Sequence, residues 1–175
     1  TIEIHYQLFP IQDLAFRTIL MFESRLEKRN ITLEGLDSEP VQVWGDPDLI
    51  GQVIYNLFEN ATKFVNTGGT ITFTFKDEPN NTSIAIRNTG AGISKEELPK
   101  IFERFYKSDD SRSHDKTGLG IGLDITKHIV RLHKAQISVS SEEGEYTEFL
   151  IRLPKKDAPA ESPTENPEKQ PKDAR

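Results

Sequence analysis

Hydrophobic side chains recur at helical spacing in three stretches of the chain. The first stretch runs over about 11–28, the second ends near Phe64, and the third covers about 120–133. Asp46 and Pro47 precede the second stretch, and this pair is typical of an N-cap followed by the first turn of a helix. The pattern therefore predicts three long amphipathic helices.

Hydrophobic and polar residues alternate strictly in other stretches, which predicts half-buried β-strands. The clearest such segment is 70–75, and shorter ones lie at 84–86, 137–139 and 149–153. A short strand pair is expected at 31–34 and 41–44, between the first two helices. Ser94 opens a capping-box spacing that predicts a short helix. Together these elements predict an α/β fold, a two-layer sandwich in which helices cover one face of a mixed sheet.

The composition changes near both ends of the chain. Pro10 interrupts any helix that enters from the N-terminal side, so residues 1–10 are expected to be a connector or a strand leading into the domain. After Pro154 large apolar residues almost disappear, and such a segment cannot offset the entropy of ordering. We therefore expect one domain at 11–154 and a disordered tail at 155–175.

Charge and composition narrow the class of partner. The 175-residue chain carries a formal net charge of -6 without a basic run, which argues against a nucleic-acid partner held through phosphate contacts. It contains no cysteine, so disulfides and thiolate metal sites are excluded. No apolar stretch approaches the roughly 18 residues that span a bilayer, and no signal peptide opens the chain. A small molecule or a protein is the expected partner.

Polar side chains form one stripe on the second predicted helix. Asn56, Asn60 and Lys63 are spaced by four and three residues, so they project from one helical face. This polar face borders the apolar one. Taken alone, such a stripe is also what any amphipathic surface helix shows.

Two glycine-rich segments follow in the sequence. Residues 88–92 come directly after a predicted strand, where glycines let a backbone approach a flat ligand closely or simply form a turn. In 116–123 three alternate glycines run into the third helix, where backbone N–H groups can point at phosphates. This segment matches neither a Walker A loop nor a dinucleotide fingerprint, and a purely structural glycine turn remains the alternative.

The order of four segments resembles the histidine kinases. Residues 56–64 resemble their N box and 88–93 their first glycine box, whereas 101–107 resemble their F box and 118–123 their second glycine box. The similarity covers about 11–154. It implies the Bergerat fold that gyrase, Hsp90 and MutL share, with ATP bound between the N-box helix and the glycine boxes. The lid over the nucleotide would be about 108–116.

The resemblance also implies a set of site residues. The ATP-binding residues would be Asn56, Asn60, Lys63, Phe64, Asn88, Gly90, Gly92, Ile93, Phe105, Tyr106, Lys107, Thr117, Gly118, Leu119, Gly120, Gly122 and Leu123. Among them Lys63 and Lys107 would contact phosphate oxygens, and Phe64 would pack against the adenine. Ile93 and Leu123 would line the base pocket.

Metal binding and catalysis are assigned by the same resemblance. Asn60 would ligate Mg²⁺ through its amide oxygen, helped by Asn56, while the metal also bridges phosphates and waters. The candidate catalytic residues are Asn56, Glu59 and Lys107. Gyrase-type relatives carry a water-activating Glu at the position of Asn56, so an Asn there favours transfer to a histidine over hydrolysis.

Three features depart from the family pattern. Asn88 stands where the first glycine box usually has an Asp, so the hydrogen bond from the adenine loses its charge assistance, worth about 1 kcal/mol. Lys107 stands where Arg is common, which keeps the charge but gives up bidentate geometry. The phosphoacceptor box is absent, and none of the four histidines, His5, His114, His128 and His133, is a credible substitute.

We therefore expect a protein-histidine kinase domain that binds Mg-ATP and phosphorylates a histidine on a helical hairpin of the same protein, in cis or in trans. A response regulator would receive the phosphoryl group. The fragment should be monomeric, its parent a homodimer, and the domain the cytoplasmic part of a membrane-anchored sensor. Two alternatives stay open: an ATPase or serine kinase of the same fold, and a degenerate nucleotide-sensing or interaction module, for which Asn88 is the support.

Overall fold

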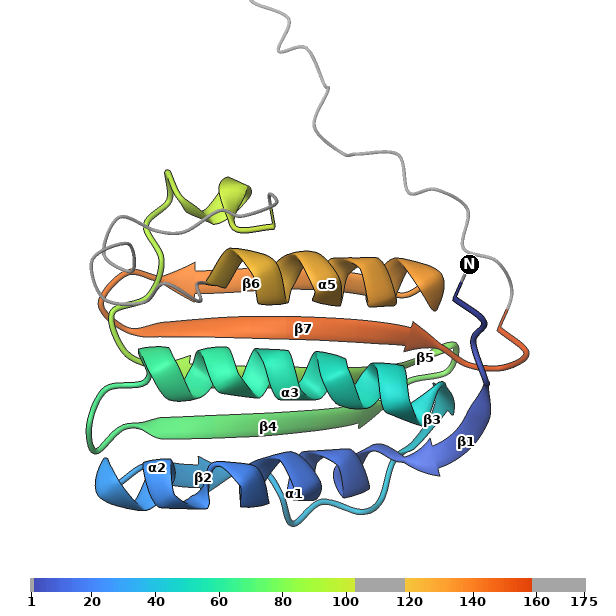
Figure 1. Ribbon diagram of the computed structural model, residues 1–175, viewed down its shortest axis with the longest axis horizontal. Helices are drawn as coiled ribbons and strands as arrows, with labels where there is room; N and C mark the ends of the chain where they lie inside the picture. The colour runs from blue at the N-terminus through green and yellow to red at the C-terminus, as the bar shows by residue number, and fades with distance from the viewer. Residues whose placement is uncertain (1, 103–118, 159–175) are drawn as a thin grey trace, which may run out of the picture.

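The protein is a two-layer α/β sandwich in which the helices cover one face of a five-stranded sheet (Figure 1). The computed structural model describes residues 2–102 and 119–158, with side chains given for the second range from 122 onward. The strands of the sheet are β2 (Thr32–Glu34), β4 (Thr70–Asp77), β5 (Asn81–Thr89), β6 (Gln136–Glu142) and β7 (Tyr146–Pro154). Their order is β2-β4-β5-β7-β6, with β2 parallel to β4 and the other pairs antiparallel. The predicted mixed sheet with helices on one face is confirmed.

The helical layer consists of α1 (Ile11–Met21), α2 (Glu23–Lys28), α3 (Pro47–Phe64) and α5 (Leu119–Leu132). The single helix expected at 11–28 is wrong, because it breaks at Phe22. The Thr18 hydroxyl donates to the Leu14 carbonyl oxygen at 2.8 Å, a contact that bends helices. The Phe22 N–H then bonds the Ile19 carbonyl at 3.0 Å, three residues back. The turn lets both Phe22 and Leu26 enter the core.

The strand pair expected at 31–34 and 41–44 is also wrong, although both strands exist. β2 pairs with β4, whereas β3 (Gln42–Gly45) pairs with β1 (Gln7–Pro10) in a separate two-stranded sheet. Gly35 explains the separation. Its φ of 86° turns the chain away after β2, and a Cβ there would lie 1.8 Å from the Phe73 carbonyl oxygen. Only glycine fits this close approach.

A shorter element begins at Ser94, as the capping-box spacing predicts. The Ser94 hydroxyl accepts a hydrogen bond from the Glu97 N–H at 3.3 Å. The helix that follows is a single 3₁₀ turn, η1 (Leu98–Lys100), rather than an α-helix. Ile101 after it is buried, so this turn closes one end of the core.

The core lies between the sheet and the helices and contains a row of aromatic rings. Ring centroids are 5.4 Å apart for Phe22 and Phe58, 5.6 Å for Phe58 and Phe73, and 5.9 Å for Phe73 and Phe75. Phe58 is fully buried on α3. Because such rings pack in few orientations, the row fixes which face of α3 turns toward the sheet and which turns toward solvent.

Hydrogen bonds join the beginning of α3 to two distant segments. The Asp46 carboxylate accepts from the N–H groups of Asp48 at 3.0 Å and Leu49 at 3.3 Å, which caps the helix, and from the His5 N–H at 3.0 Å. The Asp46 N–H donates to Nε2 of buried His133 at 3.1 Å. Burial alone would raise the pKa of Asp46, but the three N–H groups that donate to its carboxylate outweigh burial and hold the pKa below its usual value.

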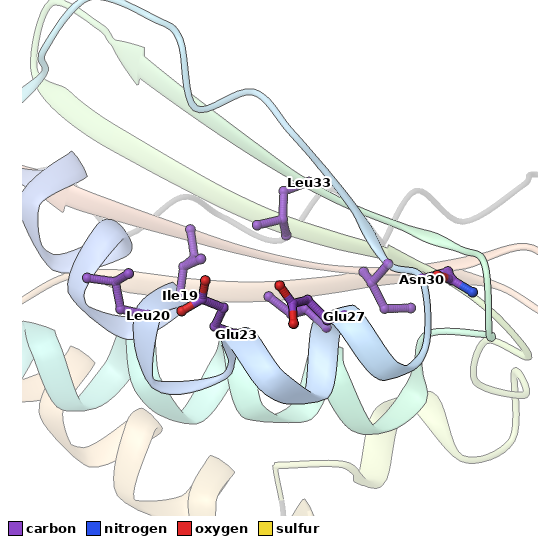
Figure 2. Close-up of a pocket in the computed structure, with 8 residues that line it drawn as sticks. Ile19, Leu20, Glu23, Glu27, Asn30 and Leu33 are labelled. Atoms are coloured by element: carbon purple, nitrogen blue, oxygen red, sulfur yellow. The ribbon is translucent and has the colours of Figure 1, made fainter.

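An apolar groove of about 450 Å³ lies where α1 and α2 face β2. Figure 2 shows Ile19 and Leu20 on the helical side and Leu33 on the strand side, with Glu23 and Glu27 at its rim. It contains none of the residues that the sequence assigns to a site. Over the described ranges, no helix combines the length and apolar character needed to cross a membrane.

Candidate functional site

The candidate site lies where the C-terminal half of α3 meets the start of α5, on the left in Figure 1. Asn56 on α3 donates from Nδ2 to the Gly122 carbonyl oxygen at 3.3 Å and to Thr126 Oγ1 at 3.4 Å, both on α5. The predicted N-box helix and the helix that follows the third glycine segment are therefore in contact. The Asn56 amide holds the two helices together at this point.

Asn60 lies one turn further along α3 and is only 7% exposed. Its Nδ2 atom has no hydrogen-bond partner among the described residues. Burying a polar group in this way costs about 1–3 kcal/mol, so proteins satisfy nearly all such groups. Amide oxygens are ligands that Mg²⁺ accepts, and half a turn of this amide exchanges its oxygen and nitrogen. The Asn60 amide, which lacks a hydrogen-bond partner in the described protein, is thus suited to bind a ligand.

Charged residues flank the two amides on α3. Lys63 forms an ion pair with Glu59 one turn before it, with 3.2 Å between Nζ and Oε1, and both side chains are partly exposed. Partial burial raises the pKa of Tyr55, and the Glu59 carboxylate, which accepts a hydrogen bond from the phenol, raises it further. Glu59 is therefore engaged by neighbours on its own helix, and Lys63 is held at the edge of the site.

The glycines of segment 88–93 are needed by the protein itself. A Cβ at Gly90 would lie 2.3 Å from the Phe64 carbonyl oxygen, and one at Gly92 would lie 2.4 Å from the Glu142 carbonyl oxygen. Both glycines have positive φ, 145° and 70°. Close backbone packing thus explains their identity, whereas the sequence suggested a ligand or an ordinary turn. The result is a loop clamped between the end of α3 and the β6–β7 turn.

Asn88 and Phe64 border this loop. Asn88 is 4% exposed, its Nδ2 donates to the Thr89 carbonyl oxygen at 2.9 Å, and its Oδ1 accepts no hydrogen bond from the described part of the chain. Phe64, by contrast, is 41% exposed at the end of α3. An available acceptor and an open aromatic face are the two features that a purine base would use.

Gly122 and Leu123 differ in their surroundings. A Cβ at Gly122 would come no closer than 3.9 Å to any described atom, the nearest being Asn56 Cβ and Cγ. Glycine inside a helix costs about 1 kcal/mol relative to alanine, and the described packing gives no reason for it. Leu123 is fully buried in the core. Ile93 packs against the core, and its N–H donates to Ser141 Oγ at 2.7 Å.

Several predicted site residues cannot be placed. Phe105, Tyr106, Lys107, Thr117 and Gly118, together with the predicted lid at 108–116, lie outside the described residues. Leu119 and Gly120 form the first turn of α5, but their surroundings are not described.

Sequence reasoning missed Arg29, which fixes the end of α3. Its guanidinium donates to the carbonyl oxygens of Thr62 and Val65, and Arg25 donates to Thr62 Oγ1 at 3.1 Å. The two Arg29 bonds satisfy carbonyls of the kind that a helix leaves open at its C-terminus. The sequence position of a cationic residue does not indicate which distant helix end it contacts.

The donor set indicates which metal the site could hold. Within 2–102 and 119–158, no group of three or more His, Asp or Glu side chains is placed to bind a metal ion. Amide oxygens alone bind hard cations weakly, and Mg²⁺ commonly keeps several waters and takes further ligands from a phosphate substrate. The site therefore fits a metal that arrives with a nucleotide.

Residues 45–157 match the family described as histidine kinase-, DNA gyrase B- and HSP90-like ATPase. The sensor protein SrrB of Staphylococcus aureus is 41% identical over 115 residues, which are 65% of this chain and 20% of SrrB. The chain thus spans about one fifth of the length of this relative.

Solved structures give the same relationship. The nucleotide-free catalytic domain of histidine kinase ThkA matches with a TM-score of 0.73 and 27% identity over 86% of this chain and 95% of that domain. ThkA in complex with the response regulator protein TrrA matches with a TM-score of 0.70 and 26% identity, over 86% of this chain and 42% of that one.

Proposed function

The chain belongs to the histidine kinase-, DNA gyrase B- and HSP90-like ATPase family, and we propose that it binds Mg-ATP and delivers the γ-phosphoryl group to a histidine. Its relatives in sequence and structure are a sensor protein and histidine kinase catalytic domains. The observation that carries the proposal is the buried amide of Asn60, whose nitrogen lacks a partner among the described residues. It lies one helical turn before the exposed Phe64 and one turn after Asn56, which contacts α5.

Each residue has a part in this proposal. Asn60, with Asn56 beside it, would hold Mg²⁺, which when bound neutralises phosphate charge and orients the phosphoryl group. Lys63 and Lys107 would contact phosphate oxygens. Phe64 would stack on the adenine. The Oδ1 atom of Asn88 would accept a hydrogen bond from the adenine amino group. Phosphoryl transfer depends mainly on such positioning and charge neutralisation.

The remaining predicted residues would complete the nucleotide pocket. Phe105, Tyr106 and the segment 117–120 would close it from the side of the lid. Gly122 would leave the Asn56 side chain without a neighbouring Cβ, since a Cβ at Gly122 would contact Asn56 at 3.9 Å. Glu59 would act by holding Lys63 in position, a role that the 3.2 Å ion pair between them supports.

The acceptor histidine would lie on a helical hairpin of the same protein. Among the described histidines, His133 is buried in the core, where its Nε2 accepts a hydrogen bond from the Asp46 N–H. A response regulator would then take the phosphoryl group, as suggested by the complex between the related ThkA and TrrA. The parent would be a dimeric, membrane-anchored sensor with this domain in the cytoplasm, at 11–154, followed by a tail from 155.

Hydrolysis is the alternative activity in this family. It requires a base that activates water, and the position that would supply one holds Asn56, an amide that cannot accept a proton at neutral pH. Its nitrogen is already used to hold α5. Transfer to a histidine is therefore favoured over hydrolysis.

Calorimetric titration of the chain with ATP, with and without Mg²⁺ and with GTP as the control, tests the proposal. We expect saturable binding that prefers ATP and is weakened without the metal. Asn60→Leu should abolish the Mg²⁺ dependence, whereas Gln52→Leu, an exposed position on the same helix, should not change it. Absence of binding at millimolar nucleotide would replace the proposal with a degenerate interaction module.

Transfer itself needs the hairpin. A fusion of this chain to a hairpin from a related kinase, supplied with radiolabelled ATP, should label its histidine. Asn60→Asp, which puts a charged group among the phosphates, should reduce labelling at least about tenfold. Release of free phosphate without labelled histidine would support the ATPase alternative.

A further inference from the structure

A second groove, of about 740 Å³, lies at the other end of the helical layer. It is bounded by Tyr6 before β1, Trp44 on β3, the end of α5 and the end of β7, on the right in Figure 1. We call it the basic groove, after its lining: Arg131, Lys134, Arg152, Lys155 and Lys156. None of the described residues that line it is acidic, although the whole chain has a net charge of -6.

Two of the five cations are already paired with carboxylates outside the groove. Arg152 contacts Glu78 at 2.9 Å, and Lys155 contacts Asp77 at 2.5 Å. The other three, Arg131, Lys134 and Lys156, form no ion pair with a carboxylate of the described chain. A concentration of unpaired like charges in one concave surface raises its potential and attracts anions.

Aromatic rings form one wall of the basic groove. The Tyr6 and Trp44 rings stack with their centroids 5.4 Å apart, and Tyr6 meets the edge of His133 at 5.6 Å. The Lys156 ammonium lies 4.8 Å from the centroid of the Trp44 ring. Because this wall is flat and apolar while the cations surround it, an occupant with both acidic and apolar groups would match the groove.

We propose that the basic groove binds an acidic, extended segment of a partner protein. Carboxylates of such a segment would meet Arg131, Lys134 and Lys156, and an apolar side chain between them would lie against the wall formed by Tyr6 and Trp44. A concave groove fits a peptide better than a flat lipid surface, which reaches only the rim. The net negative charge of the rest of the chain disfavours a long nucleic acid.

Trp44 supplies the measurement, because it is the one tryptophan in the sequence. We would titrate the chain with a short synthetic peptide of Asp and Glu residues interrupted by Phe, and follow tryptophan fluorescence. The matched peptide carries Asn and Gln in place of Asp and Glu. The acidic peptide should shift the emission in a saturable way with an affinity that falls as salt is added, and the neutral peptide should not.

Variants locate the binding. Replacing Arg131 and Lys156 by Gln should lower the affinity for the acidic peptide at least about tenfold. Replacing Arg17 and Lys28, exposed cations on α1 and α2, should leave its affinity within about twofold. Both double variants should retain the thermal unfolding transition of the unmodified chain, which separates lost binding from lost folding.

Three results would overturn the proposal. One is equal binding of the neutral peptide, and another is unchanged affinity after replacement of Arg131 and Lys156. The third is fluorescence that responds to anionic phosphatidylglycerol vesicles but not to the peptide, which would make the surface a membrane contact. ATP titration is a separate experiment on the opposite end of α5, so its failure would not affect this conclusion.

Discussion

The two ends of α3 differ in how far the protein satisfies its own polar groups. At the beginning of the helix, the Asp46 carboxylate accepts three backbone hydrogen bonds. The backbone N–H of Asp46 donates a further one to His133. Near the end, Asn60 has a buried nitrogen without a partner in the described structure, and Phe64 exposes its ring. The polar groups at the beginning of α3 therefore find their partners within the protein, whereas the end of α3 is suited to bind a ligand.

Glycines show the same difference. A Cβ at Gly45, just before Asp46, would be 3.3 Å from both His133 and Ile50, so this end is tightly filled. A Cβ at Gly122, opposite the far half of α3, would meet nothing described closer than 3.9 Å. Changes at the first end should lower stability without altering binding, and changes at the second should alter binding without lowering stability. The predictions below test this separation.

The largest effect is expected from Asp46→Ala. Loss of the helix cap and of the bond to His5 should lower the free energy of unfolding by about 2–3 kcal/mol, measured by urea denaturation. Asp46→Asn is the matched control, because its amide oxygen can still cap the helix, and about half of the loss should return. ATP affinity at a temperature where both variants are folded should stay within about twofold. A stability equal to that of the unmodified chain would show that the network contributes little.

Asn60→Leu should change stability in the opposite direction. A side chain of similar shape without polar atoms removes the unsatisfied nitrogen, so the free energy of unfolding without nucleotide should rise by about 1–2 kcal/mol. The gain from added Mg-ATP, present in the unmodified chain, should disappear. Thermal unfolding with and without Mg-ATP measures both. Destabilisation by Leu would mean that the amide has a structural partner.

Asn88→Asp should strengthen adenine binding. A charged acceptor in place of the neutral Oδ1 should improve the free energy of ATP binding by about 1 kcal/mol, which is roughly fivefold in the dissociation constant. Calorimetric titration with ATP measures the change, and GTP, which lacks the adenine amino group, serves as the control. Equal affinity for ATP in both proteins would remove Asn88 from the base pocket.

Gly122→Ala should give a smaller effect. Alanine is the better helix former, and the nearest described atoms leave room for a methyl group, so stability should rise by about 0.5–1 kcal/mol. The same methyl group would occupy space beside Asn56, so ATP affinity should fall. Urea denaturation and calorimetry are the two measurements. An alanine that lowers stability would show close packing at this position.

The smallest expected effect is the loss of stability at acid pH. The pKa of Asp46 is below its ordinary value of 3.8, so its charged form stabilises the fold fully above that value. This contribution should be lost as the pH falls through the lowered pKa of the folded state. The stability difference between the unmodified chain and Asp46→Asn, measured from neutral pH to below 3.8, should therefore shrink only at the acid end. A difference that does not vary with pH would contradict the shift.

Local signals in the sequence predicted local structure well. Asp46 and Pro47 marked the beginning of α3, and the spacing of Asn56, Asn60 and Lys63 placed all three on one helix. The break at Phe22 was not predictable, because it depends on a hydroxyl that bonds its own helix and on the core that receives Phe22. The pairing of β2 with β4 and of β3 with β1 was not predictable either, because the sequence of a strand does not specify which strand it pairs with.

The candidate site was predictable only as far as its motifs. Four ordered segments identified the family, but the contacts that shape the site join residues far apart in sequence. Arg29, the residue that follows α2, bonds the end of α3, and Ser141 on β6 accepts a hydrogen bond from the N–H of Ile93. Periodicity and spacing describe neighbours along one element, so they contain no information on such contacts.

The order of strands in the sheet has a consequence for how the chain is made. β5 is central, and its two neighbours are β4, which precedes it directly, and β7, which is the last of the described strands to be synthesised. Until β7 arrives, one edge of β5 presents unpaired N–H and C=O groups next to apolar side chains, a template for aggregation. Nascent chains that end before Tyr146 should therefore need a chaperone, and a truncation at that point should yield inclusion bodies rather than a smaller folded domain.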